Sequence, residues 1–213
     1  METVKTPLIE YGVATMMLAG QTAAGDRHLV KPYADGVLVA VVDGLGHGAE
    51  AAAAADLAVR TLESHAGEPV VSLFNRCHDV LRCSRGAVMS IAAFSSRDGT
   101  MAWLGVGNVE GVLLRRAADA ENRPEALLLR AGVLGKQLPP LIAAVVPVRQ
   151  GDILLLASDG IRSEFAGDVM VTDRTQKIAD RILASYGKGT DDALVLVTRY
   201  IGDESRSDEE EPG

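Results

Sequence analysis

The segment from Gly36 to Gly48, GVLVAVVDGLGHG, constrains the fold more than any other part of the chain. Its first residues are almost all apolar, which is the pattern of a strand buried on both faces. An Asp-Gly pair and a glycine-rich turn follow, and the alanine-rich stretch after them is typical of a helix. Asp43 therefore stands where a buried strand reaches the surface, a position that suits either a plain turn or a site for an ion or a phosphate.

Length and composition favour one domain in a reducing compartment. The chain has 213 residues, of which 47% are hydrophobic and 23% are charged, so it can fill one sizeable core. We expect a single domain over residues 1–201. No run approaches the roughly 20 apolar residues that span a bilayer, and the N-terminus lacks the apolar segment of a signal peptide. We therefore expect no membrane partner. Cys77 and Cys83 fall on different faces of an expected helix and cannot pair locally, which favours a cytoplasmic protein.

Most of the net charge of −8 lies in the C-terminal segment 202–213, which holds six acidic residues and one arginine. This segment has almost no apolar residue to bury, so we expect a disordered acidic tail. The remainder of the chain is close to neutral. Nucleic acid is excluded as a partner, because contacts to a phosphate backbone need clustered lysines and arginines.

Strand patterns outnumber helix patterns and occur in adjacent runs joined by tight turns. This arrangement predicts antiparallel sheets rather than repeated βαβ units. The turn at residues 97–99, Arg-Asp-Gly, is a hairpin signal. Helices are expected at about 49–65, 69–85 and 173–186. Strands are expected at residues 8–18, 36–43, 87–96, 100–107, 109–116, 125–130, 141–148, 152–158 and 193–200.

Four further acidic residues occupy the same kind of position as Asp43. Asp26 lies just before the strand pair that includes 36–43, Asp159 follows the apolar run DILLLAS, and Asp191 and Asp192 precede the last strand. Each alone suits a turn or a cap. Carboxylates gathered at strand ends, with no Cys or His among them, suit hard cations, so the set predicts Mg²⁺ or Mn²⁺ rather than zinc. Two such ions about 3.5–4 Å apart can clamp a phosphoryl group.

Six motifs together resemble one enzyme family in their order and spacing. That family is the metal-dependent PPM-type (protein phosphatase 2C-like) serine/threonine phosphatases, and the likeness is greatest to their SpoIIE-like branch. It covers the chain from about Glu10 to Tyr200. The motifs are AGD at 24–26, VVDGLGHG at 41–48, SRGAVMSI at 84–91, GVGNVEG at 105–111, ASDGI at 157–161 and GTDDALVLV at 189–197.

The resemblance implies an α+β fold, a four-layer α-β-β-α sandwich of two antiparallel sheets flanked by helices. It implies two metal ions in a cleft at one end of the sandwich. Asp43 would bridge both ions, Gly44 would contribute its carbonyl oxygen, and Asp159 and Asp191 would complete the ligand set. Asp26 matches an acid that contacts a metal directly or orders its water, while Asp192 matches a supporting position.

Two departures from the better-known members concern the substrate phosphate and the leaving group. No arginine stands just before Asp26 to grip a phosphate, so Arg27 is a candidate for that role. His47 is displaced along its loop from the histidine that eukaryotic members use. It is a candidate general acid, since its ordinary pKa range suits proton transfer, and a plain loop residue is the other reading.

The implied reaction is hydrolysis of phosphoserine or phosphothreonine on partner proteins by a hydroxide that bridges the two ions. In its small size the chain resembles those family members that reset stress signalling. That resemblance implies phosphorylated STAS-domain proteins of the stressosome as partners. Two alternatives stay open: a catalytically silent scaffold that binds phosphoproteins, and a phosphatase for a phosphorylated anti-sigma factor antagonist. Rossmann and P-loop nucleotide sites are excluded, because the spacing of glycine and lysine that they need is missing.

Overall fold

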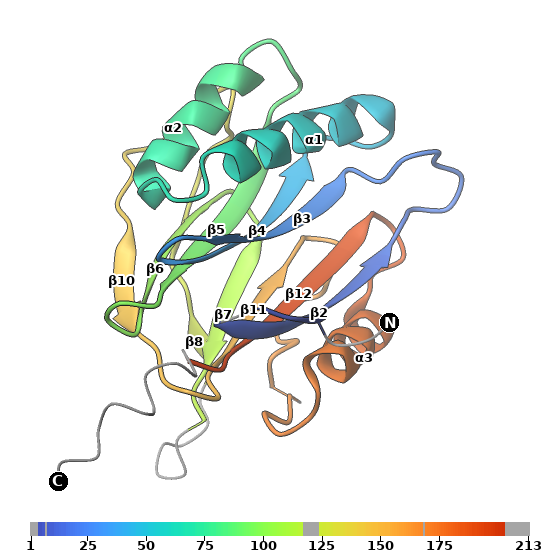
Figure 1. Cartoon of the computed structure of the whole chain (residues 1–213). Helices are drawn as coiled ribbons and strands as arrows, with labels where there is room; N and C mark the ends of the chain where they lie inside the picture. Colours follow the sequence, from blue (N-terminus) through green and yellow to red (C-terminus); the bar gives the residue numbers. More distant parts are fainter. Residues whose placement is uncertain (1–3, 7, 117–123, 168, 203–213) are drawn as a thin grey trace, which may run out of the picture.

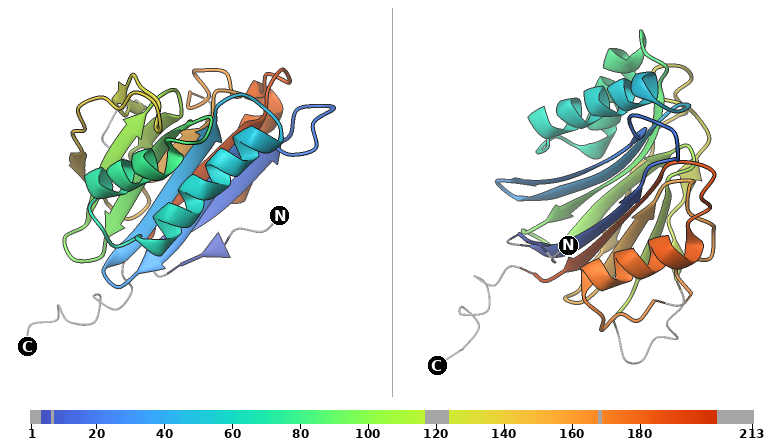
Figure 2. Two further views of the ribbon diagram at one scale, coloured as in Figure 1. Left: turned by 90° about the horizontal axis from the view of Figure 1, so that it is seen from above. Right: turned by 90° about the vertical axis from the view of Figure 1, so that its right-hand side faces the viewer.

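The computed structural model describes residues 4–6, 8–116, 124–167 and 169–202. Residues 203–213 of the predicted acidic tail lie outside these ranges. Two six-stranded sheets stack face to face, with two helices on one outer face and a third helix on the other (Figures 1 and 2). The predicted α-β-β-α sandwich is confirmed.

The first sheet is antiparallel throughout and has the order β1-β2-β12-β11-β7-β8. Its central strands pair over long registers, from Ile9 opposite Tyr200 to Met16 opposite Ala193. The strands are β1 (Val4–Lys5), β2 (Ile9–Met16), β12 (Ala193–Tyr200), β11 (Ile153–Ala157), β7 (Glu110–Leu114) and β8 (Glu125–Ala126).

The second sheet has the order β10-β6-β5-β4-β3, and β9 adds to the edge of β6. Its strands are β10 (Ala144–Pro147), β6 (Thr100–Val106), β5 (Ala87–Ser95), β4 (Gly36–Gly44), β3 (Asp26–Tyr33) and β9 (Leu129–Arg130). The main path is antiparallel as predicted, but β9 runs parallel to β6, so the sheet is mixed. The predicted hairpin turn at 97–99 joins β5 to β6.

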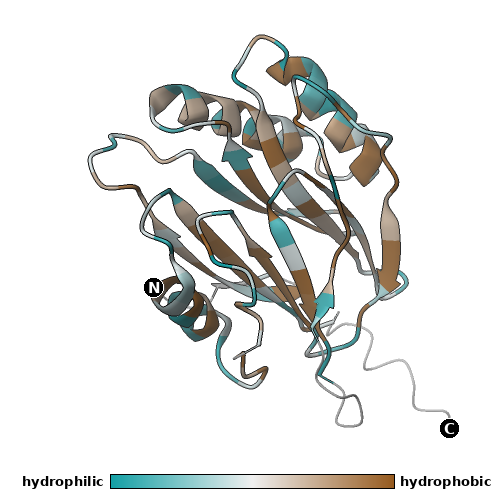
Figure 3. Ribbon diagram, turned by 180° about the vertical axis from the view of Figure 1, so that it is seen from behind, coloured by the Kyte–Doolittle hydropathy of each residue, from teal (hydrophilic) through white to brown (hydrophobic). Residues whose placement is uncertain are grey.

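Three apolar layers hold the sandwich together, and β4 contributes to two of them. Leu38, Ala40 and Val42 pack toward the helices on the outer face, and the three valines between and before them pack toward the other sheet. This alternation is why the segment is apolar at nearly every position. Figure 3 shows the hydrophobic residues along the strands of both sheets, whereas the connecting loops are more hydrophilic.

The helices cover the outer faces through their apolar sides. Helices α1 (Ala49–Ser64) and α2 (Val70–Leu81) pack on the second sheet, and α3 (Thr175–Tyr186) packs on the first. The side of α1 that faces the sheet is mostly alanine, which lets the helix lie close to the strands. No helix in the part of the chain that the structure describes is long and apolar enough to cross a membrane.

Several sequence-based boundaries were wrong for identifiable reasons. The sequence implied a partner strand for residues 36–43 but gave no range for it; this strand, β3, faces α1 on one side and carries charged residues and a proline within the sequence DRHLVKPY. The single strand expected at 125–130 is two short strands, β8 and β9, that belong to different sheets. The helix expected at 69–85 ends at Leu81, so Cys83 lies beyond it and is exposed, whereas Cys77 is buried; neither cysteine forms a disulfide.

Candidate active site

The acidic residues singled out in the sequence meet at one end of the sandwich. Asp43 is the second-last residue of β4 and Asp26 is the first residue of β3, and the two stand opposite each other in the strand register. Asp159 follows β11 by two residues, and Asp191 precedes β12 by two. Because neighbouring strands run antiparallel, the end of one strand and the start of the next share an edge. One pair of acids therefore comes from each sheet.

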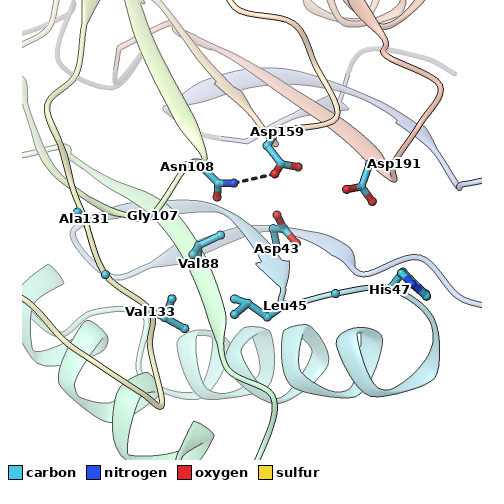
Figure 4. Close-up of a pocket in the computed structure, with 12 residues that line it drawn as sticks. Asp43, Leu45, His47, Val88, Gly107, Asn108, Ala131, Val133, Asp159 and Asp191 are labelled. Carbon is cyan, nitrogen blue, oxygen red and sulfur yellow. Dashed lines mark hydrogen bonds between the residues drawn. The ribbon is translucent and has the colours of Figure 1, made fainter.

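A pocket of about 500 Å³ opens between these strand ends. In Figure 4 the carboxylates of Asp43, Asp159 and Asp191 point toward one another across it. Asp26 does not line the pocket; it is buried, 8% exposed, on the strand beside Asp43. The full lining is Asp43, Leu45, Gly46, His47, Val88, Gly107, Asn108, Ala131, Gly132, Val133, Asp159 and Asp191.

Burial and mutual repulsion make these carboxylates reluctant to ionise. Burial, together with the charges of the neighbouring aspartates, raises the pKa of Asp43 to about 8. Burial likewise raises the pKa of Asp26 to about 7, against a hydrogen bond from Ser158 that lowers it. The pKa of Asp159 is raised by burial and by Asp191, while the Lys188 ammonium partly offsets this. In their ionised form these carboxylates thus lack enough compensating positive charge from the protein itself.

Asp192 has a supporting position. Its Oδ1 accepts a hydrogen bond from the Leu18 amide at 2.8 Å, and its Oδ2 accepts one from the Gly25 amide at 2.6 Å. Both oxygens are therefore engaged with backbone, and Asp192 fixes the segment that leads into Asp26. The sequence-based interpretation of this residue as a supporting group agrees with these contacts.

Two polar residues of the site received no role from the sequence. Asn108 Nδ2 donates to Asp159 Oδ2 at 2.7 Å, which orients that carboxylate (Figure 4). The Ser158 hydroxyl donates to Asp26 Oδ2 at 2.6 Å and accepts from the Leu194 amide at 2.9 Å, so it links the two sheets. Their positions in the sequence could have indicated a role, since each lies in a motif at the end of a strand that reaches the acidic edge of the sandwich.

The Asp-Gly pairs at 43–44 and 159–160 need glycine because backbone from another element approaches closely. A Cβ added at Gly44 would lie 2.0 Å from the carbonyl oxygen of Ala51 in α1. A Cβ at Gly160 would lie 1.9 Å from the carbonyl oxygen of Asp192. Each glycine thus lets the carboxylate before it sit against a neighbouring segment, at the packed edge of the pocket.

Arg27 and His47, the candidates for phosphate binding and proton transfer, do not join the group of aspartates. The Arg27 guanidinium bonds Asp56 at 2.6 Å and the carbonyl oxygens of Ala24 and Asp26, so it is used within the fold and is not directed at a bound phosphate. The candidate role of Arg27 in gripping phosphate is therefore not supported. His47 lines the pocket at its rim and is exposed.

The donor set fits a hard divalent cation. All the acidic groups present carboxylate oxygens, the ligands that Mg²⁺ and Mn²⁺ prefer. An added cation would favour the ionised form of these carboxylates, whose pKa values are raised by burial and by mutual repulsion. Within the described residues, no three Asp, Glu, His or Cys side chains already form a compact metal cluster.

Sequence comparison finds a curated relative. The chain is 31% identical over 94 residues to the phosphoserine phosphatase RsbX of Bacillus subtilis (strain 168). The match spans 44% of this chain and 47% of RsbX, about half the length of that relative.

Comparison of structures covers nearly the whole chain. A structure described as "The bacterial stressosome: a modular system that has been adapted to control secondary messenger signaling" contains a chain that is 33% identical, with a TM-score of 0.80 over 90% of this chain and 99% of that one. The crystal structure of RsbX in complex with magnesium matches with a TM-score of 0.82 at 20% identity, over 93% of this chain and 98% of RsbX, which supports the fold.

The family model for stage II sporulation protein E (SpoIIE) matches residues 33–201, which include Asp43, Asp159 and Asp191. The match covers most of the chain and extends from the end of β3 to just past β12. The predicted resemblance to PPM-type phosphatases is confirmed, and the chain belongs to the SpoIIE family.

Proposed function

We propose that this protein is a metal-dependent phosphatase that hydrolyses phosphoserine or phosphothreonine on partner proteins. The observation that carries the proposal is the meeting of Asp43, Asp159 and Asp191 around one pocket, from strands of both sheets. Membership of the SpoIIE family supports the same reaction. A pocket rich in carboxylates has no affinity for a phosphoryl group by itself, because the charges repel, so a cation between them is needed.

Divalent ions, when bound, supply positive charge for the transferring phosphoryl group and a water of lowered pKa to attack phosphorus. Asp43, Asp159 and Asp191 would hold these ions, with the Gly44 carbonyl as a further ligand. Asp26, buried and opposite Asp43 in the strand register, would support or complete the ligand set. Mg²⁺ or Mn²⁺, and two ions rather than one, remain predictions from the family.

The surrounding residues orient the acids. Asn108 fixes the Asp159 carboxylate, Ser158 fixes Asp26, and Asp192 fixes the backbone before Asp26. These contacts hold the carboxylates and the backbone in fixed orientations, which raises affinity for an ion. The Asp-Gly pairs at 43–44 and 159–160 set the backbone positions on which the arrangement depends.

The partner class follows from the relatives. RsbX is a phosphoserine phosphatase, and the second similar chain comes from a structure whose description concerns the bacterial stressosome. We therefore propose phosphorylated STAS-domain proteins of a stressosome as substrates, in the cytoplasm. A phosphorylated anti-sigma factor antagonist is the alternative substrate, and a silent phosphoprotein-binding scaffold is the alternative function.

The first experiment measures phosphate release from p-nitrophenyl phosphate with Mg²⁺, with Mn²⁺ and with a chelator. Asp43→Asn removes a carboxylate of the pocket, and Asp79→Asn, an exposed residue on α2, is the matched control. We expect metal-dependent release that Asp43→Asn loses and Asp79→Asn keeps. Phosphorylated STAS-domain protein and phosphorylated antagonist are then compared as substrates. Absence of release from every substrate with either metal would contradict the proposed activity and leave the scaffold.

A further inference from the structure

The pocket has two unlike sides. The carboxylates of Asp43, Asp159 and Asp191 form one, and the side chains of Leu45 and Val133 stand on the other, with Val88 between them (Figure 4). We name Leu45, Val88 and Val133 the apolar wall. A phosphoryl group makes polar contacts and gains nothing from apolar side chains. At about 500 Å³, the pocket is also within the range of about 300–1,000 Å³ that accommodates much larger ligands.

The apolar wall is held firmly on its Val133 side. The next residue, Leu134, is fully buried against α1, α2 and the second sheet. Its amide donates to the Ala87 carbonyl oxygen at 2.9 Å, and the Ala87 amide donates back at 3.2 Å. The Val133 amide donates to the Gln137 carbonyl oxygen at 2.9 Å, which closes a tight turn. Val133 is thus fixed at the start of β5 although it belongs to a long connection between β9 and β10.

The Leu45 side is fixed in a similar way. The Leu45 amide donates to the Gly86 carbonyl oxygen at 3.0 Å, one residue before β5. The side chains of Leu45 and Val133 are only partly buried, and both pack against the core between the sheets. A partly exposed apolar surface that is preorganised in this manner loses little conformational entropy when a ligand covers it.

We propose that the apolar wall receives an apolar side chain of the substrate protein adjacent to the phosphorylated residue. The inference rests on the proposed phosphatase function and assigns it a sequence preference. Covering apolar surface is favourable, whereas an acidic side chain at the same place would lose water and be repelled by the aspartates across the pocket. The substrate segment is therefore apolar, and not acidic, beside its phosphoserine.

The test uses phosphoserine peptides that differ at one residue. In one series the residue before the phosphoserine is Leu, Ser or Glu, and in the other series the residue after it is changed in the same way. We expect Leu to exceed Ser by about tenfold in kcat/KM in one of the two series, and Glu to be the poorest, since small differences in apolar contact change discrimination by about 10–200-fold. Fluorescence anisotropy of labelled peptides gives the same ranking without turnover.

Val133→Thr tests the wall itself, because threonine has nearly the shape of valine but carries a hydroxyl. Val145→Thr is the matched control, since Val145 is 66% exposed on the edge strand β10 and does not line the pocket. The readout is the Leu-to-Ser ratio within each variant, which cancels differences in active fraction. We expect Val133→Thr to lower this ratio toward one and Val145→Thr to keep it.

The two proposals fail in distinguishable ways. Hydrolysis of p-nitrophenyl phosphate with equal kcat/KM for the Leu, Ser and Glu peptides would refute the proposed role of the apolar wall and leave the phosphatase function intact. Equal anisotropy-derived affinities would overturn it as well, even if no peptide is hydrolysed. A Leu preference that Val133→Thr and Val145→Thr retain equally would show that another surface reads the neighbouring residue.

Discussion

Gly44→Ala is the substitution whose effect can best be worked out from the structure. The added Cβ would lie 2.0 Å from the Ala51 carbonyl oxygen, while ordinary contact begins at 3.4 Å, so β4 and α1 must separate by about 3.4 − 2.0 = 1.4 Å. Both elements are packed at this point, and Ala51 is fully buried. Gly44 does not have a positive φ, so the effect comes from the clash and not from backbone preference.

Two consequences follow from a separation of this size. Overpacking a tight interior costs about 1–3 kcal/mol, which for a domain of this length lowers Tm by about 2–12 °C. A displacement of about 1 Å in a reacting geometry lowers activity by about 100-fold, and here the displaced residue is the neighbour of Asp43. We expect both effects in the same variant.

The assay compares metal-dependent hydrolysis of p-nitrophenyl phosphate and thermal unfolding in Gly44→Ala and Gly67→Ala. Gly67, between α1 and α2, is the matched control, since its added Cβ would make only ordinary contacts of 3.6 Å and 3.9 Å with the Tyr33 ring. We expect Gly67→Ala to behave as wild type. A Gly44→Ala protein with unchanged Tm and activity within threefold of wild type would refute the reasoning.

Three further predictions concern the charges of the site. In the metal-free protein the pKa values of Asp43 and Asp26 are raised to about 8 and about 7, so the folded state holds protons that the unfolded state releases near pH 4, and stability falls as pH rises toward 8. The increase in Tm that Mg²⁺ produces should therefore grow from pH 6 to pH 8. Differential scanning fluorimetry measures this increase, and an increase that does not depend on pH would contradict the prediction. Asp192→Asn should weaken Mg²⁺ binding by about 10–100-fold in calorimetry, because one of its two backbone amides loses its acceptor; an unchanged Kd would argue against its supporting role. His47→Ala should lower kcat by less than tenfold, since His47 is exposed at the rim, whereas a loss of about 100-fold or more would identify it as the general acid.

The architecture could be predicted from the sequence where the hydrophobic pattern was strong. The apolar run before Asp43, the hairpin at 97–99 and the alanine-rich helix all have local signals, and the structure contains them. The range of strand β3 could not be predicted, because its charged residues and proline obscure the alternation. The division of the strand expected at 125–130 into β8 and β9 could not be predicted for another reason. Each is only two residues long, and the tertiary fold alone decides which sheet it joins.

The meeting of the aspartates at one end of the sandwich was predictable to a similar degree, while their roles stay predictions. The aspartates could be recognised because they follow or precede strands, and antiparallel pairing then brings Asp26 opposite Asp43. The hydrogen bond from Asn108 to Asp159 depends on side chains 51 residues apart, and the engagement of Arg27 with Asp56 depends on how α1 lies over β3. Neither has a sequence signal of its own. The apolar wall is of the same kind, because Val133 reaches the pocket only through the burial of Leu134.

The pairing of β2 with β12 has a practical consequence. Met16 stands opposite Ala193 beside the acids, and Ile9 stands opposite Tyr200 at the other end of the same two strands. Eight residues of extended chain span roughly 25 Å, so Ile9 and Tyr200 lie about that far from the pocket. A fluorescent domain or surface tether joined at Ile9 or Tyr200 would therefore leave the pocket mouth clear, so that an immobilised protein should still accept a large phosphoprotein.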